Sequence, residues 1–597
     1  MMKILRYLTA VAGIFVLWGC TSMDQYPEDS MSPETYFSSE AELRQYTNSF
    51  YTLMPTASSH SLSWYEEQGE LVATNLPENE IMGTRPLPTK SSEVGWTWTK
   101  LRDINYFLQY SHRCADKEIR EHYEGVAYFF RAYFYYNMLT KFGEVPVYLE
   151  PIGSSDVASL CKPRDSREEV INQILEDCDR AFNQMLPQGK KTTEVCAWTA
   201  LALKSRAALF EGTFRKYHDG DPFNPNHLPW DELLKICAES SKKLIEEGGY
   251  SLHKTGKEPY REMFYSTEAN ANEYIWARIA GVSAGKMHNA NDQLMNRGVG
   301  ATKRMICYYL NSDGTKFTDR PDWNTVGYLD ECKNRDPRMA QTILCPGYKQ
   351  KGSATVSFTN IAATKGCYQY IKYVSDASQN SFDHCRSALP IFRLAEVYLN
   401  YAEALAELGT LTQRDLDMSV NKIRDRAGMP DLKMADANAH PDPFMMSEEW
   451  GYPNVTQSAN TGVILEIRRE RLVEMALELN HYNDILRWKE GKVYEKPHYG
   501  MYFPSTGSYD LTGDGKYNIC IYDGKKPSVS GVKYFKLNTD IVLSEGDHGF
   551  AIRNNEPGLA RHWNEEKDYL YGIPTSQRSL SGGALTQNPG WDDGLTF

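Results

Sequence analysis

Several features that would define special classes of protein are scarce in this 597-residue chain. Its longest apolar run, residues 7–17, has about eleven residues, whereas a helix that crosses a membrane needs about twenty. The 28 prolines and 42 glycines are too few for a collagen-like or low-complexity chain. Basic residues do not predominate, since 65 Lys and Arg stand against 78 Asp and Glu, and the net charge of −13 disfavours nucleic acid as a partner. With 41% hydrophobic and 12% aromatic residues, the chain has the composition of a large folded globular protein.

The common motifs of catalysis and metal binding are also missing. The sequence contains no GxSxG elbow, P-loop, HExxH helix or GxGxxG fingerprint. Its twelve cysteines show no paired CxxC spacing and no interleaved histidines, which argues against a zinc module or a compact disulfide framework. These absences count against an enzyme and against a resident cofactor.

The first twenty residues have the pattern of an exported lipoprotein. Lys3 and Arg6 precede the apolar run, whose length is that of a signal-peptide core. Residues 17–20, Leu-Trp-Gly-Cys, resemble the lipobox of bacterial lipoproteins, in which cleavage before the cysteine frees it for acylation. Two or more acyl chains attach a protein stably to a membrane. We expect residues 1–19 to be removed and Cys20 to carry the lipid; the alternative is a secretory signal followed by an incidental cysteine.

Helical periodicity is concentrated in segments with clear start and stop signals. Ser166 and Glu169, for example, form a capping box. Alanines recur on the helices and glycines follow their ends, so neighbouring helices can approach closely, as in tetratricopeptide repeats. The predicted helices are residues 121–142, 166–181, 197–210 (ending at Gly212), 231–247, 392–408, 419–427, 462–480 and about 483–490.

The predicted fold is therefore mainly α, with about four tetratricopeptide-like helix pairs that form a curved scaffold. Long irregular insertions separate these pairs, and they are rich in Gly, Pro, Asn and aromatic residues. Irregular segments held on a rigid scaffold are where binding usually resides. The insertions are residues 58–99, 280–350, 436–457 and 494–555.

Five ordered blocks between Cys20 and Trp591 carry a family resemblance. The most recognisable is PIFRLAEVYLNYAEA at residues 390–404. On these blocks the chain resembles the SusD/RagB family of outer-membrane nutrient-binding lipoproteins. One departure is Leu479 with His481, where the family more often has glycine and arginine. The other blocks contain Arg131, Tyr133, Tyr136, Phe142, Gly143 and Pro146; Asn421, Arg424, Arg426 and Gly428; Asp484, Arg487 and Trp488; and Trp563, Tyr569, Pro574, Asn588, Pro589 and Trp591.

The resemblance implies a function and a division of the chain. It implies a non-enzymatic lipoprotein, anchored in the outer membrane and facing the exterior, that captures oligosaccharide for a SusC-type TonB-dependent transporter. It divides the chain into a signal peptide (1–19), an N-terminal SusD-like region (20–270) and a C-terminal SusD/RagB region (271–597). The alternatives are peptide uptake by the same architecture, a surface glycosidase with two carboxylates in a cleft, and a helical scaffold without a small-molecule site.

Two insertions combine aromatic rings with polar side chains, as a glycan site requires, because sugar C–H faces stack on rings and hydroxyls need polar partners. No residue-level match to the family can be made in these variable loops. For each tryptophan the alternative is packing in the core or in a loop. The candidate ligand residues are Trp64, Trp96 and Trp98 in the first insertion, and Arg320, Trp323, Asn324 and Tyr328 in the second.

One loop reproduces the first part of a calcium-binding loop, with oxygen donors at alternating positions and a glycine at the turn. The twelfth position is Ile521, so the usual bidentate glutamate is missing, and Asp523 could replace it only if the backbone curled differently. The alternative is a plain glycine-rich turn. The candidate structural calcium ligands are Asp510, Thr512, Asp514, Lys516 and Asn518.

Charged residues on the C-terminal helices also stand three or four positions apart, which places them on shared helix faces. We interpret them as a structural network between packed helices and not as catalytic acid and base pairs. The residues are Arg393, Glu396, Glu403, Arg468, Arg469, Glu470, Arg471 and Glu474.

Overall fold

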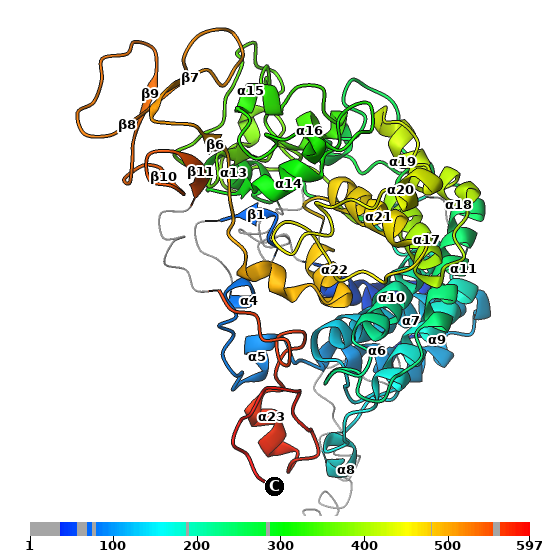
Figure 1. Cartoon of the computed structure of the whole chain (residues 1–597). Coiled ribbons are helices and arrows are strands. Elements are labelled where there is room, and N and C mark those ends of the chain that lie inside the picture. Colours follow the sequence, from blue (N-terminus) through cyan, green and yellow to red (C-terminus); the bar gives the residue numbers. More distant parts are fainter. Residues whose placement is uncertain are drawn as a thin grey trace, which may run out of the picture.

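The computed structural model describes residues 36–55, 69–74, 79–153, 155–186, 190–281, 287–478, 480–552 and 561–597. The signal segment, Cys20 and Trp64 lie outside these ranges. In the described part the chain is mainly helical, with long irregular segments between the helices (Figure 1). This arrangement confirms the predicted fold class.

The scaffold is built from the longer helices, and shorter helices lie in the connections. The longer ones are α2 (Glu40–Asn48), α6 (Thr99–Tyr110), α7 (Lys117–Phe142), α9 (Arg167–Gln184), α10 (Ala197–Tyr217), α11 (Asp231–Glu247), α17 (Leu394–Leu408), α19 (Val420–Ala427), α21 (Thr461–Glu474) and α22 (His481–Trp488). The shorter ones are α4 (Asn79–Met82), α5 (Ser91–Val94), α8 (Val157–Leu160), α12 (Glu262–Tyr265), α13 (Ala290–Asn296), α14 (Lys303–Tyr308), α15 (Tyr328–Glu331), α16 (Pro337–Thr342), α18 (Gln413–Asp417), α20 (Met434–Ala439) and α23 (Thr575–Leu580).

The scaffold helices pack in succession. Helix α7 contacts α9, α9 contacts α10, α10 contacts α11, α11 contacts α17, and α17 contacts α21. Ala200, Ala207 and Ala402 are fully buried in these helices, so their small side chains allow the close approach that the sequence predicts. The contact of α11 with α17 crosses the predicted boundary between residues 270 and 271, and the division into regions at that position stays a prediction.

Most predicted helix ends agree with the structure. Ser166 accepts from the Glu169 N–H while the Glu169 carboxylate accepts from the Ser166 N–H, which confirms the capping box of α9. Helices α17 and α19 end at Gly409 and Gly428, whose φ values of 74° and 73° are the left-handed conformation that favours glycine.

Two predicted ends are wrong. Helix α10 continues through Gly212 to Tyr217. A Cβ at residue 212 would lie 2.8 Å from Leu234 Cδ2 on α11, so the glycine leaves room for that side chain. Gly212 is therefore a packing position and not a stop. Helix α21 ends at Glu474 instead of residue 480, and α22 starts at His481.

Small sheets join irregular segments of the chain, and one of them leads directly into the scaffold. Strand β2 (Tyr274–Arg278) pairs with β5 (Leu389–Arg393), which runs directly into α17. The remaining sheets are β1 (Val72–Ala73) with β3 (Gly300–Ala301) and β4 (Tyr368–Gln369); β6 (Tyr502–Phe503) with β11 (Gly549–Ile552) and β10 (Val542–Leu543); and β7 (Gly507–Tyr509) with β8 (Ile519–Tyr522) and β9 (Lys533–Lys536).

The C-terminal tail returns to the first long helix. The Asn588 side-chain amide donates to the Phe142 carbonyl at the end of α7 at 2.9 Å, and the Trp591 indole N–H donates to the Leu570 carbonyl at 3.1 Å. Asn588 therefore ties the C-terminal tail to α7, while Trp591 makes a contact within the tail itself.

Candidate functional site

The first predicted ligand pair, Trp96 and Trp98, lies at the entrance of α6. Their rings meet edge to face at 5.4 Å. Trp96 is only 2% exposed and also packs on Phe142, so its faces are already covered by protein. Trp98 is half-buried, contacts Tyr148 at 5.5 Å and lines a cavity of about 430 Å³. Trp96 lines the same cavity but is packed in the core, so Trp98 is the more accessible member of the pair.

The second predicted group is divided between surface and core. Trp323 and Asn324 are half-buried, and Arg320 forms a two-pronged ion pair with Asp322 at 2.7 and 2.9 Å. Tyr328 is 6% exposed, and its hydroxyl donates to the Leu344 carbonyl at 2.6 Å, so it serves packing. Trp323 is therefore the aromatic ring of this group that a ligand can reach.

Trp323 belongs to a larger set of contacting rings, which we call the aromatic row. It meets Trp450 edge to face at 5.1 Å, and Trp450 lies 5.7 Å from Tyr499. Tyr499 stacks on Phe550 at 4.6 Å, and Phe550 meets Tyr502 at 5.6 Å. All members except Phe550 are half-buried, so each keeps part of its ring accessible.

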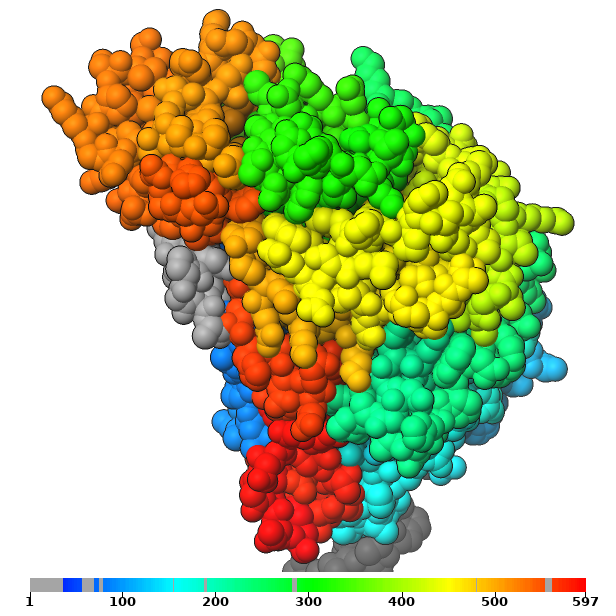
Figure 2. Space-filling model, viewed as in Figure 1, coloured from blue at the N-terminus to red at the C-terminus, as the bar shows by residue number. Residues whose placement is uncertain are grey.

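Buried polar contacts and a small sheet fix the aromatic row. The Tyr308 hydroxyl donates to the Trp450 carbonyl at 3.0 Å, and the Lys303 N–H donates to the Tyr499 carbonyl at 2.6 Å. Strand pairing sets Tyr502 opposite Phe550. The segments around residues 300–345, 440–457 and 495–505 meet on the face seen in Figure 2. With Phe550 of β11, the row is thus a preformed surface made from four parts of the sequence.

The two predicted groups do not form one site. Helix α5, which precedes Trp96, and α15, which follows Trp323, lie well apart in Figure 1. The aromatic row therefore combines one predicted residue with four that the sequence analysis did not single out: Trp450, Tyr499, Tyr502 and Phe550. They lie in the insertions 436–457 and 494–555, which were predicted to be irregular and aromatic, but nothing in the sequence pairs them with Trp323.

The candidate calcium residues form the turn between β7 and β8. Asp510 accepts N–H bonds from Thr512, Gly513 and Gly515 at 2.8–2.9 Å, and Asn518 accepts one from Leu511 at 2.6 Å. Asp514 accepts the N–H of Lys516. The turn closes on itself through these bonds, and calcium binding there stays a prediction that titration calorimetry with calcium chloride can test.

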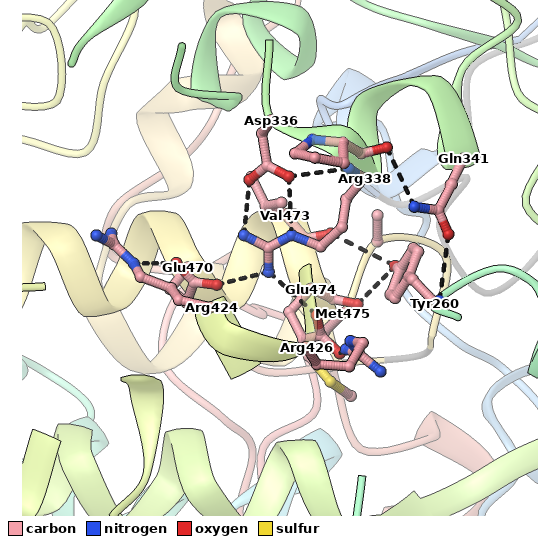
Figure 3. A network of polar contacts seen from close by, with 12 residues as sticks. Tyr260, Asp336, Arg338, Gln341, Arg424, Arg426, Glu470, Val473, Glu474 and Met475 are labelled. Atoms are coloured by element: carbon pink, nitrogen blue, oxygen red, sulfur yellow. Dashed lines mark hydrogen bonds and ion pairs between the residues drawn. The ribbon is translucent and has the colours of Figure 1, made fainter. Parts of the chain in front are cut away.

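The charged residues of the C-terminal helices form a buried network, as predicted. Arg338 bridges Asp336 at 2.7 Å and Glu470 at 2.5 Å (Figure 3). Arg393 pairs with Glu474 at 2.7 Å. Burial raises the pKa of Glu474, but the surrounding arginine charges lower it more, so the carboxylate stays ionised. These carboxylates form ion pairs that hold the helices together, and they are not exposed to a substrate.

Membrane-spanning helices and clustered metal ligands are both lacking in the part of the chain that the structure describes. Among those residues, no helix combines the length and the apolar character that crossing a bilayer requires. In the same ranges, no three His, Cys, Asp or Glu side chains gather closely enough to hold a metal ion.

Comparison with known proteins gives consistent matches over nearly the whole chain. The family described as "SusD family" matches residues 250–591, and the one described as "Starch-binding associating with outer membrane" matches residues 24–209. SusD-like protein P2 of Formosa agariphila is 22% identical over 511 residues, which cover 81% of this chain and 90% of the relative.

Solved structures share the fold. A SusD-like carbohydrate binding protein from Bacteroides fragilis has a TM-score of 0.67 at 18% identity, with 92% of this chain and 99% of that chain covered. A second SusD-like protein from Bacteroides fragilis has a TM-score of 0.64 at 18% identity, with 95% and 100% covered.

Proposed function

The chain belongs to the SusD family, and from this premise we propose that it captures oligosaccharides at the cell surface for a SusC-type TonB-dependent outer-membrane transporter. The proposal includes attachment to the outer membrane through lipid on Cys20, with the folded body facing the exterior. It includes no catalytic step: ligand binds to a mostly preformed surface, and the protein then closes like a lid over the transporter.

The observation that carries the proposal is the aromatic row. Half-buried Trp323, Trp450, Tyr499 and Tyr502 offer accessible ring area in a connected series, which suits successive sugar units with flat C–H faces. Exposed aromatic surface rimmed by polar groups is typical of binding sites. Polar side chains stand beside Trp323 in the sequence and can bond to sugar hydroxyls; they are Arg320, Asp322 and Asn324.

A purely binding role is supported by the burial of the acidic side chains and by their bonds to arginine. A glycosidase needs two carboxyl groups facing one cleft at a suitable separation. Glu403, Glu470 and Glu474 are each less than 3% exposed and each bonds to arginine. Turnover of any polysaccharide by the purified protein would count against a pure binding role.

The test is an alanine series measured by calorimetry against a panel of polysaccharides and against mixed peptides. Trp450→Ala and Tyr499→Ala are each expected to weaken glycan binding about tenfold, which corresponds to ~1.4 kcal/mol. Trp198→Ala is the matched control, because Trp198 is also half-buried but packs on Phe182 in the helical scaffold.

Three outcomes would contradict the proposal. One is equal loss of binding in the Trp198 control. Another is failure of the native protein to bind any polysaccharide in the panel. Binding of peptides alone, with the same sensitivity to Trp450→Ala, would assign the row to peptide uptake instead. Co-purification with a SusC-type transporter from outer membranes tests the partner separately.

A further inference from the structure

Two cysteine thiols contact each other in the insertion that carries Trp323. Cys332 directly follows α15, and Cys345 lies shortly after α16. Twelve residues separate them in the sequence. Cys332 is half-buried and Cys345 is 7% exposed, and both are free thiols in this structure. Their contact is the largest influence on the pKa of Cys332, which it raises together with burial.

The backbone on both sides of this thiol pair is held in place. The Cys332 N–H donates to the Tyr328 carbonyl at 3.1 Å, and the Tyr328 hydroxyl donates to the Leu344 carbonyl at 2.6 Å. Leu344 directly precedes Cys345, and its own N–H donates to the Gln369 carbonyl of β4 at 2.8 Å. The two thiols therefore meet because hydrogen bonds hold α15 beside the segment that follows α16.

Other cysteine thiols in the described ranges contact other groups. Cys237 contacts the Ser205 hydroxyl at 3.7 Å, and Cys385 contacts the Ser387 hydroxyl at 3.4 Å. Among the described cysteines whose pKa is shifted, Cys332 is the one whose largest influence is another cysteine. A disulfide requires two side chains that point toward each other, and this pair meets that condition.

Disulfides form in exported proteins and are rare in the reducing cytoplasm. We propose that Cys332 and Cys345 form a disulfide once the chain has been exported, and that the oxidant is a second disulfide, which exchanges with the pair. We call this bond the insertion disulfide. The inference rests on the export that the proposed function includes. The alternative is a permanently reduced pair of thiols that only fills space in the fold.

The exchange is balanced in electrons and protons. The Cys332 thiol, the more exposed of the two, loses its proton, and its sulfur attacks one sulfur of the oxidant, which releases the first half of the oxidant as a thiolate. The Cys345 thiolate then attacks the Cys332 sulfur and releases the second half. The two cysteines give up two protons and two electrons, and the oxidant becomes two thiols. Because the pKa of Cys332 is raised, the first step should be faster in mild base than at neutral pH.

The insertion disulfide would close a loop that contains α16. Within that loop, Arg338 forms ion pairs with Glu470 and Glu474 of α21, which attach the loop to the scaffold. Trp323 of the aromatic row stands nine positions before Cys332. The bond would thus join α15, which follows Trp323, to a loop that α21 already holds. It would restrict the unfolded chain and anchor this side of the binding surface.

Peptide mapping without reduction tests the bond on the exported, lipidated protein. Free thiols are first blocked with iodoacetamide, and trypsin then releases peptides 317–333 and 339–349, which hold Cys332 and Cys345 as their only cysteines. We expect one linked species, whose mass is lower by two hydrogen atoms than the sum of the two free peptides. Reduction before blocking should raise the amounts of the two alkylated peptides about tenfold or more.

A second arm tests the geometry without export. The chain without residues 1–19 and with Cys20→Ser is made in the reducing cytoplasm and purified with its thiols free. It is then treated with oxidised glutathione at about pH 8.5, where more of the thiol is ionised. Peptides 317–333 and 339–349 should become linked, as in the exported protein.

Two variants of this chain separate the steps of the exchange. In Cys345→Ser protein the second step is blocked, so Cys332 should keep a bound glutathione instead. Cys307→Ser is the matched control, because Cys307 is a buried cysteine of α14 whose loss should leave the link intact. Circular dichroism checks that both variants fold.

The outcomes are distinct. Unlinked, alkylated peptides from the exported protein, with the acyl mass present on Cys20, overturn the insertion disulfide and leave the proposed function standing. A link from either peptide to any other cysteine overturns it too. Failure of glutathione to close the pair in the folded chain also overturns it, since the thiols then do not reach each other. If the link is present but no polysaccharide binds, the proposed function fails and the disulfide stands.

Discussion

The imidazole Nε2 of His481 lies 2.9 Å from Oε2 of Glu70, and both side chains are buried. The Tyr452 hydroxyl donates to the other carboxylate oxygen of Glu70. His481 stands where the family more often has arginine, and the structure shows what the side chain at that position does. It supplies a partner to a carboxylate that sits just before β1, in the insertion between α2 and α6.

Removing the His481 side chain is expected to destabilise the fold, because the Glu70 carboxylate would stay buried without its charged partner. His481→Gln should lower the free energy of unfolding by about 3 kcal/mol at neutral pH, because breaking a buried pair leaves one charge uncompensated. Glu70→Gln/His481→Gln should recover part of the loss. Urea unfolding of the native protein, the single variants His481→Gln and Glu70→Gln, and the double variant gives the coupling energy. A coupling near zero would mean that the two groups do not stabilise each other.

Stability should fall in acid through two buried carboxylates. Burial raises the pKa of Glu70, but the charge and hydrogen bond of His481 lower it further, to about 2. At Glu403 burial likewise raises the pKa, but the charge and hydrogen bonds of Arg487 lower it more, to about 2. Groups with a lowered pKa stabilise the fold above their unfolded value of 4.5, and that stability is lost as the pH falls toward 2.

Each of these carboxylates is expected to contribute about 3 kcal/mol to that loss. Urea unfolding between about pH 5 and about pH 2 measures it. Glu403→Gln protein should be less stable than the native chain at pH 5 and should lose less on acidification. An unchanged pH slope in this variant would rule Glu403 out as a source.

Glu490 should act in the opposite direction. Burial raises its pKa to about 8, because Arg468 stays 3.7 Å away and the Asn454 N–H offsets only part of the cost. A raised pKa stabilises the fold below 4.5, and this contribution is lost as the pH rises through 8. Glu490→Gln should be close to the native chain near pH 5 and exceed it by about 5 kcal/mol near pH 9. Equal stability at both pH values would contradict this.

Gly212 should tolerate no side chain, although it lies inside a helix. Ala is the better helix former by about 1 kcal/mol, but its Cβ would meet Leu234 at 2.8 Å, and overpacking costs ~1–3 kcal/mol. Gly212→Ala is therefore expected to lower the melting temperature. Gly327→Ala is the control, since Gly327 has open space and an extended backbone with φ −67°. A rise in melting temperature for Gly212→Ala would refute the packing argument.

The same glycine shows where sequence reasoning ends. Local signals predict the caps of α9, α17 and α19 because each depends on residues within four positions of one another. Whether Gly212 stops a helix or admits Leu234 depends on α11, which sequence periodicity does not place. The aromatic row could not be predicted from the sequence for the same reason. Trp323 and Trp450 are far apart in the chain, and only the fold brings their ring centroids to 5.1 Å. Burial of Trp96 and Tyr328 is likewise set by tertiary neighbours.

The buried charge network offers a last prediction, because its members differ in how many partners they hold. Arg338 bonds to Asp336, Glu470 and Glu474. Glu470 also has Arg424, and Glu474 also has two other arginines, so each keeps a cation when Arg338 is lost. Glu474→Gln instead removes the carboxylate that three arginines share, leaving their charges to repel one another without solvent.

Glu474→Gln is therefore expected to destabilise the fold more than Arg338→Met, for which the loss should be about 3 kcal/mol. Lys333→Met is the surface control: Lys333 and its partner Asp330 are more than half exposed, and such a pair contributes less than about 1 kcal/mol. Urea unfolding of the three variants ranks them. If Arg338→Met were the most damaging, the network would depend on its bridge from the second insertion to α21 more than on the charge balance around Glu474.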